Sequence, residues 1–112
     1  TPVADYGMLA DAVKSAQTLG VSTQVGSVFS TAHFYHPSPE VNRQARDLGM
    51  LAVEMETAGL YWIASAFHKR ALSLLTISDH LFTGEALSAE DRQESFHEMM
   101  EVALETAWKW AE

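Results

Sequence analysis

Apolar positions recur along the chain with a helical period in some segments and an extended pattern in others. Between about residues 5 and 19 they recur at three- and four-residue spacings, which predicts an amphipathic helix: Met8, Leu9, Ala12, Val13, Ala16 and Leu19. Gly20 stands where a left-handed residue ends a helix. Residues 21–31 are rich in β-branched side chains and predict a strand.

The sequence HPSPE then interrupts the extended pattern. Ser38 and Pro39 are typical of a helix cap followed by a first-turn proline, and Gly49 ends the short helix that they begin. The apolar run 50–55, which contains Glu54, predicts a second strand.

Three further elements follow this strand. Residues 57–69 predict a helix whose apolar face consists of Leu60, Ile63, Ala64 and Phe67. Residues 71–78 are almost uniformly apolar, which is typical of a strand covered on both faces. Ser88 begins a long helix, with acids in its first turn that suit the positive end of the helix dipole. The apolar stripe of this helix consists of Phe96, Met99, Met100, Ala103, Leu104, Ala107 and Trp108.

This alternation of helices and strands predicts an α/β fold with a mainly parallel central sheet flanked by helices. Three strands make a thin sheet for this class, and the chain opens on a helix without a strand before it. We therefore expect residues 1–112 to be the C-terminal portion of a single, larger domain. Ligands of such sheets gather at the carboxyl ends of the strands.

Composition narrows the choice of partner. Of 112 residues, 47% are apolar, and 15 acidic residues against 7 basic ones give a net charge of -8. The bases are spread along the chain, so nucleic acid is not an expected partner. The absence of cysteine excludes a disulfide framework and a thiolate metal site, and we expect a cytoplasmic protein. No apolar run approaches the roughly 18–20 residues that cross a bilayer, so no membrane association is expected.

Carboxylates follow two of the predicted strands. Asp79 comes directly after residues 71–78, where an acid can cap a helix, form an ion pair, or serve as a functional acid whose pKa poor solvation raises. Glu54 and Glu56 flank Met55, and strand alternation would send both glutamates to one face. A simpler interpretation is that these two acids only begin the following helix. Adjacent strand ends would otherwise hold several acids around one crevice.

Three blocks of sequence carry a resemblance to a known family. AVEMETAGLYWIA, LLTISDHLFTGE and DRQESF occur in the order and spacing of the C-terminal half of the bacterial, hexamer-forming type of purine nucleoside phosphorylase, within the nucleoside phosphorylase-I superfamily. The block FSTAHFYHP resembles the base-binding segment of that family, whereas LFTGEALS departs from its pattern. The resemblance implies a phosphorylase/hydrolase-like fold and reversible phosphorolysis of purine nucleosides. It also implies inorganic phosphate as co-substrate, no cofactor, and a homohexamer built as a trimer of dimers.

The resemblance further implies roles for single residues. Asp79 matches the carboxylic acid that donates a proton to the imidazole-ring nitrogen of the departing purine, and Arg92 matches the arginine that assists this transfer. Glu56 matches the glutamate that binds the ribose hydroxyls, and Met55 packs beneath the sugar. The other pocket residues are Phe34, which stacks on the base, and Val53, Glu54 and Ser78, which line the pocket.

Elementary chemistry agrees with these roles. Cleavage of an N-glycosidic bond leaves negative charge on the base, so protonation of the departing base lowers the barrier. A carboxylate can accept hydrogen bonds from two sugar hydroxyls and so orient the sugar. Phosphate calls for arginines, helix N-termini or a glycine-rich turn, and none of these is grouped in this sequence. In the resembled family they belong to the N-terminal half and to a neighbouring subunit, so we expect the chain alone to be inactive without that half.

Other interpretations stay open at this point. A related nucleosidase that uses water, or a pyrimidine nucleoside phosphorylase, shares the fold and part of the Val-Glu-Met-Glu pattern. A non-catalytic assembly or binding module would use its acids only to cap helices. Asp79 with His80, and Phe34, favour the purine phosphorylase. His33 and His36 have no evident third partner, so no metal site is expected.

Overall fold

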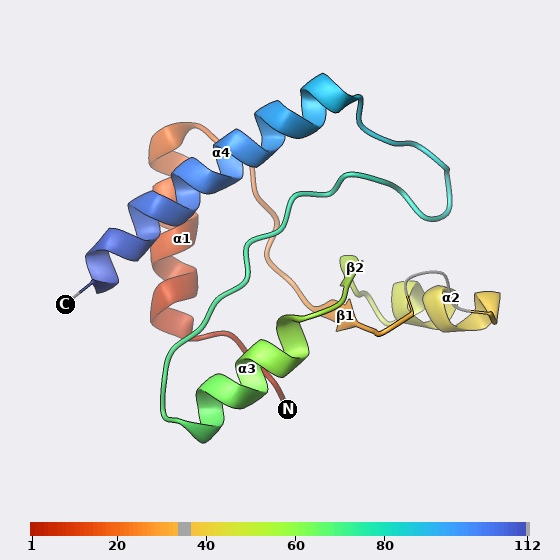
Figure 1. Ribbon diagram of the computed structural model, residues 1–112, viewed down its shortest axis with the longest axis horizontal. Helices are drawn as coiled ribbons and strands as arrows, with labels where there is room; N and C mark the ends of the chain where they lie inside the picture. The colour runs from red at the N-terminus through yellow and green to blue at the C-terminus, as the bar shows by residue number, and fades with distance from the viewer. Residues whose placement is uncertain (34–36, 112) are drawn as a thin grey trace. The chain divides into compact units, whose positions relative to one another are not determined.

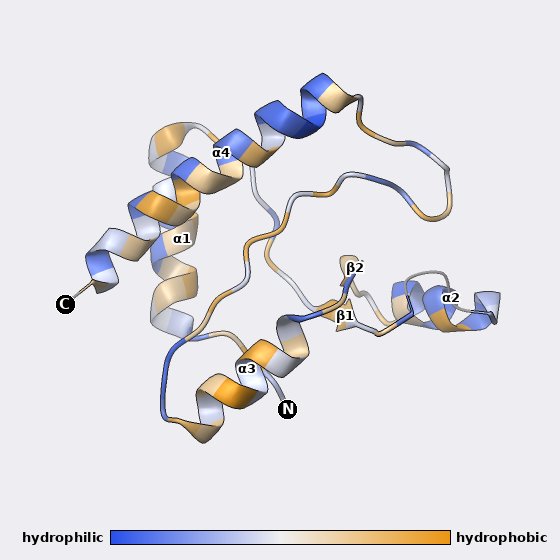
Figure 2. Cartoon of the chain, viewed as in Figure 1, coloured by the Kyte–Doolittle hydropathy of each residue, from blue (hydrophilic) through white to orange (hydrophobic). Residues whose placement is uncertain are grey.

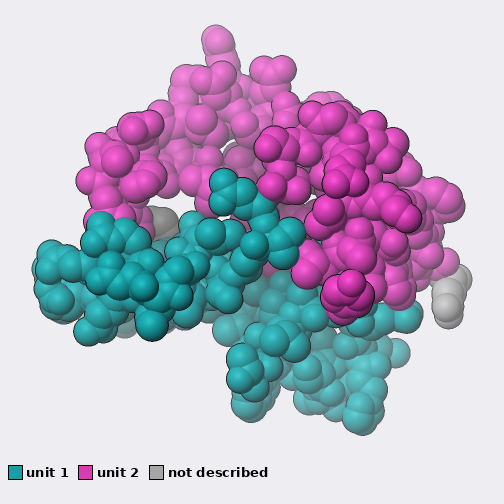
Figure 3. Space-filling model, turned by 180° about the vertical axis from the view of Figure 1, so that it is seen from behind, with its two compact units in different colours: residues 1–5, 24–72 teal, residues 6–23, 73–112 magenta. Residues whose placement is uncertain are grey.

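The computed structural model describes residues 1–33 and 37–111, in which helices and two short strands alternate (Figure 1). The elements are α1 (Tyr6–Leu19), β1 (Val28–Ser30), α2 (Pro39–Asp47), β2 (Ala52–Glu54), α3 (Thr57–Ala66), α4 (Ala89–Ala107) and the 3-10 turn η1 (Trp108–Trp110). The chain forms two compact units, which Figure 3 distinguishes by colour. Unit 1 consists of residues 1–5 and 24–72, and unit 2 of residues 6–23 and 73–112.

Unit 1 contains a sheet of two parallel strands. β1 and β2 pair in a register that places Ser30 opposite Glu54, the last residue of each strand. The ladder continues one step further, because the Thr31 N–H donates to the Glu54 carbonyl at 2.9 Å. α2 connects the two strands in sequence, and α3 follows β2 and packs on β1. The predicted α/β class with parallel strands is therefore confirmed.

The helix ends that depend on local sequence are confirmed. The Ser38 side chain caps α2 by accepting the Glu40 N–H at 3.4 Å, and Pro39 is the first residue of this helix. Gly49, with φ 83°, ends α2, and Gly20, with φ 73°, ends α1. These positive φ values lie in the left-handed region, which glycine adopts without the penalty that a Cβ imposes.

Unit 2 is built on the contact between α1 and α4. Ala12, Ser15 and Ala16 of α1 are buried, and so are Val102 and Thr106 of α4. Small side chains at these α1 positions allow the two helices to approach closely, which excludes water from both faces. This contact forms the buried part of unit 2.

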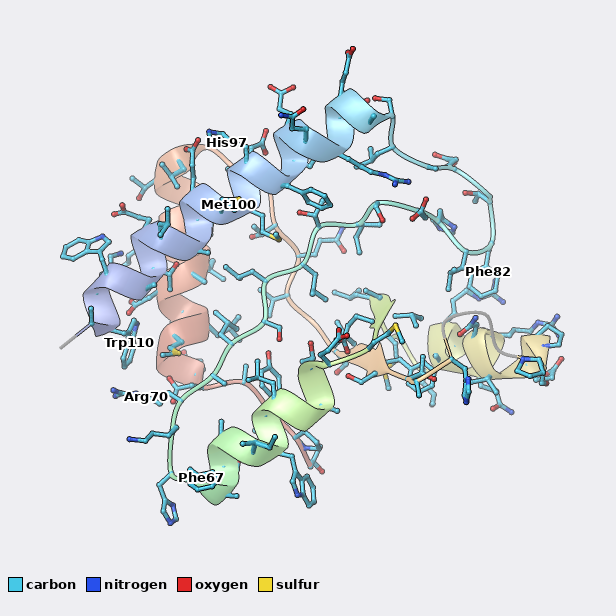
Figure 4. The ribbon with its side chains drawn as sticks, viewed as in Figure 1. Phe67, Arg70, Phe82, His97, Met100 and Trp110 are labelled. Carbon is cyan, nitrogen blue, oxygen red and sulfur yellow. The ribbon has the colours of Figure 1, made fainter. Side chains whose placement is uncertain are left out.

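Polar contacts join η1, which follows α4, to α1. The Trp110 indole N–H donates to Asp11 Oδ2 at 2.9 Å, and Lys109 Nζ donates to Ser15 Oγ at 3.4 Å. Figure 4 shows the Trp110 ring beside α1. Since the Trp110 indole is half-buried and has its polar atom satisfied, it adds both packing and a hydrogen bond to this contact.

The apolar stripe predicted for α4 is wrong in its placement around the helix. Met100, Leu104 and Trp108 of that stripe are exposed, whereas Val102 and Thr106 face α1 and are buried. The difference arises because the buried face of a helix is the face that its neighbour covers, and α1 covers the Val102 face. Leu60, Ile63 and Phe67 of the apolar face predicted for α3 are likewise exposed. Figure 2 shows hydrophobic colouring along this helix.

The strand predicted for residues 71–78 is also wrong, because these residues form no strand. Leu75 and Ile77 are 43% and 56% exposed, so the segment is not covered on both faces. A strand needs a neighbour that pairs with its backbone N–H and C=O groups. Among the described residues that follow position 70, pairing of the β type consists of one isolated antiparallel bridge between Asp79 and Ala86.

The two strands that do form are shorter than their sequence patterns predict. The pattern over residues 21–31 yields only β1, and the pattern over residues 50–55 yields only β2. Each strand can be only as long as the partner that pairs with it, and each partner here has three residues.

Within the described ranges, none of the helices combines the length and apolarity needed to span a bilayer.

Candidate functional site

The predicted site residues fall into two groups, one in each unit. Val53, Glu54, Met55 and Glu56 belong to unit 1, at and just beyond the end of β2. Ser78, Asp79 and Arg92 belong to unit 2, in the segment before α4 and in its first turn. The structure brings the members of each group together, and the meeting of both groups in one crevice stays a prediction.

Glu54 is the centre of a hydrogen-bond network in unit 1. Its Oε2 atom accepts the backbone N–H groups of Glu56 at 2.8 Å and Thr57 at 2.7 Å, at the start of α3. Its Oε1 atom accepts the hydroxyl of Ser30, whose oxygen in turn accepts the Ala58 N–H at 2.9 Å. The N–H groups of Glu56, Thr57 and Ala58 are donors that a helix start leaves without partners inside the helix. Glu54 therefore does cap α3, as the simpler interpretation of this acid proposed.

The environment of Glu54 changes its acidity. Partial burial raises the pKa of Glu54, but hydrogen bonds from Ser30, Glu56 and Thr57 together outweigh this effect and hold the pKa below its ordinary value of 4.5. A carboxyl group whose pKa is lowered on folding contributes stability above its ordinary pKa and loses it as the pH falls through the lowered value. Glu54 is thus an ionised cap at neutral pH.

We predict that the amide signals of Glu56 and Thr57 report the protonation of Glu54. In a nuclear magnetic resonance titration of the chain, both amide proton shifts are expected to be constant at neutral pH and to move below about pH 4.5, where the carboxylate becomes protonated and both bonds weaken. The E54Q variant, which cannot ionise at this position, is the control and should lose the part of these movements that Glu54 causes. Amide shifts that move equally in both proteins would contradict the capping role.

Met55 and Glu56 lie between the end of β2 and the first residue of α3. Both side chains are exposed, whereas Thr57, which follows them, is buried. Glu56 occupies the N-cap position of α3, but its carboxylate makes no capping hydrogen bond. Glu54 performs that function instead, which leaves the Glu56 carboxylate available to accept hydrogen bonds from a ligand. Val53 is half-buried within β2.

In unit 2, Asp79 is held by two side chains. The Ser78 hydroxyl donates to its Oδ2 atom at 2.8 Å, and Arg92 Nη2 contacts its Oδ1 atom at 3.1 Å. The side chains of Asp79 and Arg92 are each 43% exposed, so this acid is not the strongly buried group that a two-sided apolar strand would have provided. The structure nevertheless unites the two residues that the sequence predicted to act together, 13 positions apart.

His80 organises the loop that follows Asp79, a role that the sequence analysis did not predict. Its Nδ1 atom accepts the backbone N–H groups of Phe82 at 3.2 Å and Thr83 at 3.1 Å. Its own backbone donates to the Glu85 carbonyl at 2.7 Å and accepts the Gly84 N–H at 3.0 Å. The loop, which carries Phe82 (Figure 4), therefore closes on itself directly beside the catalytic candidate.

Ser30 is the other residue that the sequence analysis missed. The Ser/Thr-rich end of the predicted strand contained it, but only the register of β1 against β2 places its hydroxyl on Glu54. Phe34 and His36 lie outside the described residues, so the prediction for Phe34 stays a prediction. Within residues 1–33 and 37–111, no three histidine, aspartate or glutamate side chains are grouped so that they could hold a metal ion.

Fold and site together define an α/β protein with acidic residues at the end of β2 and in the segment before α4. The comparison with known families shows which family of α/β proteins it belongs to. Residues 1–110 match the phosphorylase superfamily, and the chain belongs to this superfamily. The resemblance found in the sequence blocks is thereby confirmed.

The curated relatives are more specific in name. The chain is 50% identical over 105 residues to purine nucleoside phosphorylase DeoD-type 2 of Vibrio vulnificus (strain YJ016). The aligned residues cover 94% of this chain and 44% of the relative. It is 51% identical, with the same coverage, to the protein of that name in Vibrio cholerae. It is 49% identical over 107 residues to purine nucleoside phosphorylase DeoD-type of Roseobacter denitrificans, covering 96% of this chain and 46% of the relative. The chain thus spans a little under half the length of these relatives.

Proposed function

We propose that this chain supplies the base- and ribose-binding part of an enzyme that catalyses reversible phosphorolysis of purine nucleosides. The products are the free purine and ribose or deoxyribose 1-phosphate. In this reaction the bond between the sugar C1′ and the purine nitrogen breaks, its electron pair leaves with the base, and a phosphate oxygen bonds to C1′. The names of relatives about 50% identical to the chain support the proposal.

The contact between Asp79 and Arg92 carries this proposal. A departing purine takes up negative charge, which a proton donated to its imidazole-ring nitrogen neutralises. We assign this donation to the Asp79 carboxyl group, which becomes a carboxylate. Arg92, whose guanidinium is 3.1 Å from Oδ1, stabilises that carboxylate, and the Ser78 hydroxyl fixes the orientation of the group. A residue that served only as a helix cap would bind backbone N–H groups, whereas the Asp79 carboxylate is contacted by the side chains of Ser78 and Arg92.

The ribose is assigned to the exposed carboxylate of Glu56. Because Glu54 caps α3, Glu56 can accept hydrogen bonds from the sugar hydroxyls without giving up a helix contact. Met55, exposed beside it, provides an apolar surface for the sugar ring. The base is assigned to Phe34, with Val53, Glu54 and Ser78 around it.

Phosphate is assigned to residues outside this chain. We refer to this chain joined to the remaining, N-terminal part of the domain as the complete enzyme. A phosphate dianion is bound by arginines or by converging N–H groups, and in unit 1 the N–H groups at the start of α3 are already occupied by Glu54 and Ser30. The resemblance supports this assignment, because it implies phosphate ligands in the N-terminal half and in a neighbouring subunit. It also supports a cytoplasmic homohexamer, built as a trimer of dimers, as the state of the complete enzyme.

Phosphate dependence provides the test of this function. We expect the complete enzyme to release hypoxanthine from inosine, or adenine from adenosine, only when phosphate is present, and we expect no release by residues 1–112 alone. Chromatographic separation of base and sugar phosphate measures both products, and uridine serves as the pyrimidine control.

Three outcomes would contradict the proposal or part of it. Release of the base at the same rate with and without phosphate would show that water is the nucleophile and would indicate a nucleosidase. Preferential cleavage of uridine would indicate a pyrimidine phosphorylase. Full phosphorolysis by the isolated chain would refute the assignment of phosphate binding to residues outside it.

A further inference from the structure

We propose that Ser30 is a positioning residue for ribose binding. Its hydroxyl holds the Glu54 carboxylate against the first turn of α3, and this contact sets the direction in which Glu56 presents its own carboxylate. The inference rests on the proposed function, in which Glu56 binds the ribose hydroxyls.

The Ser30 hydroxyl joins three elements of unit 1. It donates to Glu54 Oε1 at the end of β2 and accepts the Ala58 N–H of α3 at 2.9 Å, while its own backbone ends β1. A hydroxyl has one proton to donate and lone pairs to accept with, so one side chain can make both bonds at the same time. Both contacts are part-buried, so water competes for them less than it does at the surface.

Both oxygens of Glu54 are consequently engaged. Oε1 binds Ser30, and Oε2 binds the backbone N–H groups of Glu56 and Thr57. The side chain is thus fixed from the sheet on one side and from the helix on the other. Loss of the Ser30 hydroxyl would free Oε1 and leave the Ala58 N–H without its acceptor, so the first turn of α3 would lose two of its anchors.

The backbone of Glu56 is held on both sides, whereas its side chain is not. Its N–H binds Glu54, and its carbonyl accepts the Leu60 N–H at 3.0 Å. Its carboxylate is exposed and makes no capping bond. This arrangement fixes the position of the Glu56 Cα atom and leaves the carboxylate oxygens available to a ligand. Both conditions are needed for one carboxylate to bind two hydroxyls at a fixed separation. A misplacement of about 1 Å in such a contact can cost on the order of a hundredfold in rate.

The test compares S30A, S30T and S27A in the complete enzyme. Ser27 is the matched control, because it is a serine that directly precedes β1 and its side chain is exposed. We expect S30A to raise the KM for inosine about tenfold and to change kcat less. S30T restores the hydroxyl and should restore the KM, and S27A should behave as the unchanged enzyme.

Two further readouts separate positioning from general loss of structure. The KM for 2′,3′-dideoxyinosine, which lacks the hydroxyls that Glu56 would bind, should change little in S30A. Hydrogen exchange of the peptide 55–60, measured by mass spectrometry, should be faster in S30A than in S30T or S27A. If S30A does not fold, E54Q undergoes the same measurements, because it removes the ionised acceptor from the same network.

The outcomes are distinguishable from failure of the proposed function. An equal rise in KM for inosine and dideoxyinosine, or unchanged KM for both, would overturn the positioning role while phosphorolysis itself persisted. If the unchanged complete enzyme shows no phosphate-dependent cleavage, the proposed function fails, and the role of Ser30 in ribose binding fails with it. Hydrogen exchange that is as slow in S30A as in S27A would overturn the anchoring of the turn independently of any activity.

Discussion

The D79N variant of the complete enzyme is expected to lose about 10²- to 10⁴-fold in kcat for inosine phosphorolysis, the range that general acid catalysis contributes. Asparagine keeps the size of the side chain and its oxygen can still accept from Arg92, but its NH2 group cannot accept from Ser78, and the amide cannot donate the proton that the purine needs. The KM should change less than kcat, because the loss falls on the transition state. Steady-state kinetics with saturating phosphate measures both quantities.

A substrate that carries its own positive charge sharpens this test. When the imidazole-ring nitrogen of the purine is already methylated, as in 7-methylinosine, the base departs without a proton, so D79N should lower its cleavage far less. D47N is the matched control, because Asp47 also contacts an arginine, Arg46 at 3.5 Å, on an exposed helix end. Unimpaired inosine turnover by D79N would instead support a non-catalytic module.

The E56Q variant is expected to raise the KM for inosine by roughly 10- to 100-fold, since a hydrogen bond to a charged group contributes about 1.5–3 kcal/mol. The amide of glutamine can accept from only one of the two hydroxyls at full strength. Discrimination between inosine and 2′,3′-dideoxyinosine should therefore decrease sharply, as the ratio of their kcat/KM values will measure.

E90Q is the matched control for this variant. Glu90 also stands at the start of a helix, in the first turn of α4, so its replacement removes the same charge from a similar place in a helix. Inosine and dideoxyinosine should be affected equally in E90Q. If E56Q behaved in the same way, the assignment of the ribose to Glu56 would be wrong.

The parts of the fold that the sequence predicted well depend on neighbouring residues in the chain. The cap at Ser38 and the left-handed glycines Gly20 and Gly49 affect only residues a few positions away in the sequence. Their effects can therefore be predicted from the local sequence. The strand predicted at 71–78 failed because a strand also needs a partner, which no local pattern supplies. The buried face of α4 was misplaced because α1, about 90 residues earlier in the chain, decides which face is covered.

The candidate site also has features that the local sequence predicts and features that depend on residues far apart in the chain. The blocks around Glu56 and Asp79 identify candidate acids by their sequence. Asp79 contacts Arg92 in the structure, and the roles of both residues stay predictions. The capping bonds of Glu54 were foreseen only as an alternative to a pocket role. Ser30 could not be found by motif, because its partner lies 24 residues away and depends on strand register.

The two bonds that His80 Nδ1 accepts determine which form of this ring the loop can use. With that nitrogen serving as acceptor, the ring hydrogen must reside on Nε2, so a single tautomer is compatible with the turn. Among substitutes, an asparagine can offer a carbonyl oxygen in a similar place, whereas a lysine has no acceptor at all. The hydrogen bonds of the loop therefore constrain the residue type at position 80, whether or not His80 contacts the purine.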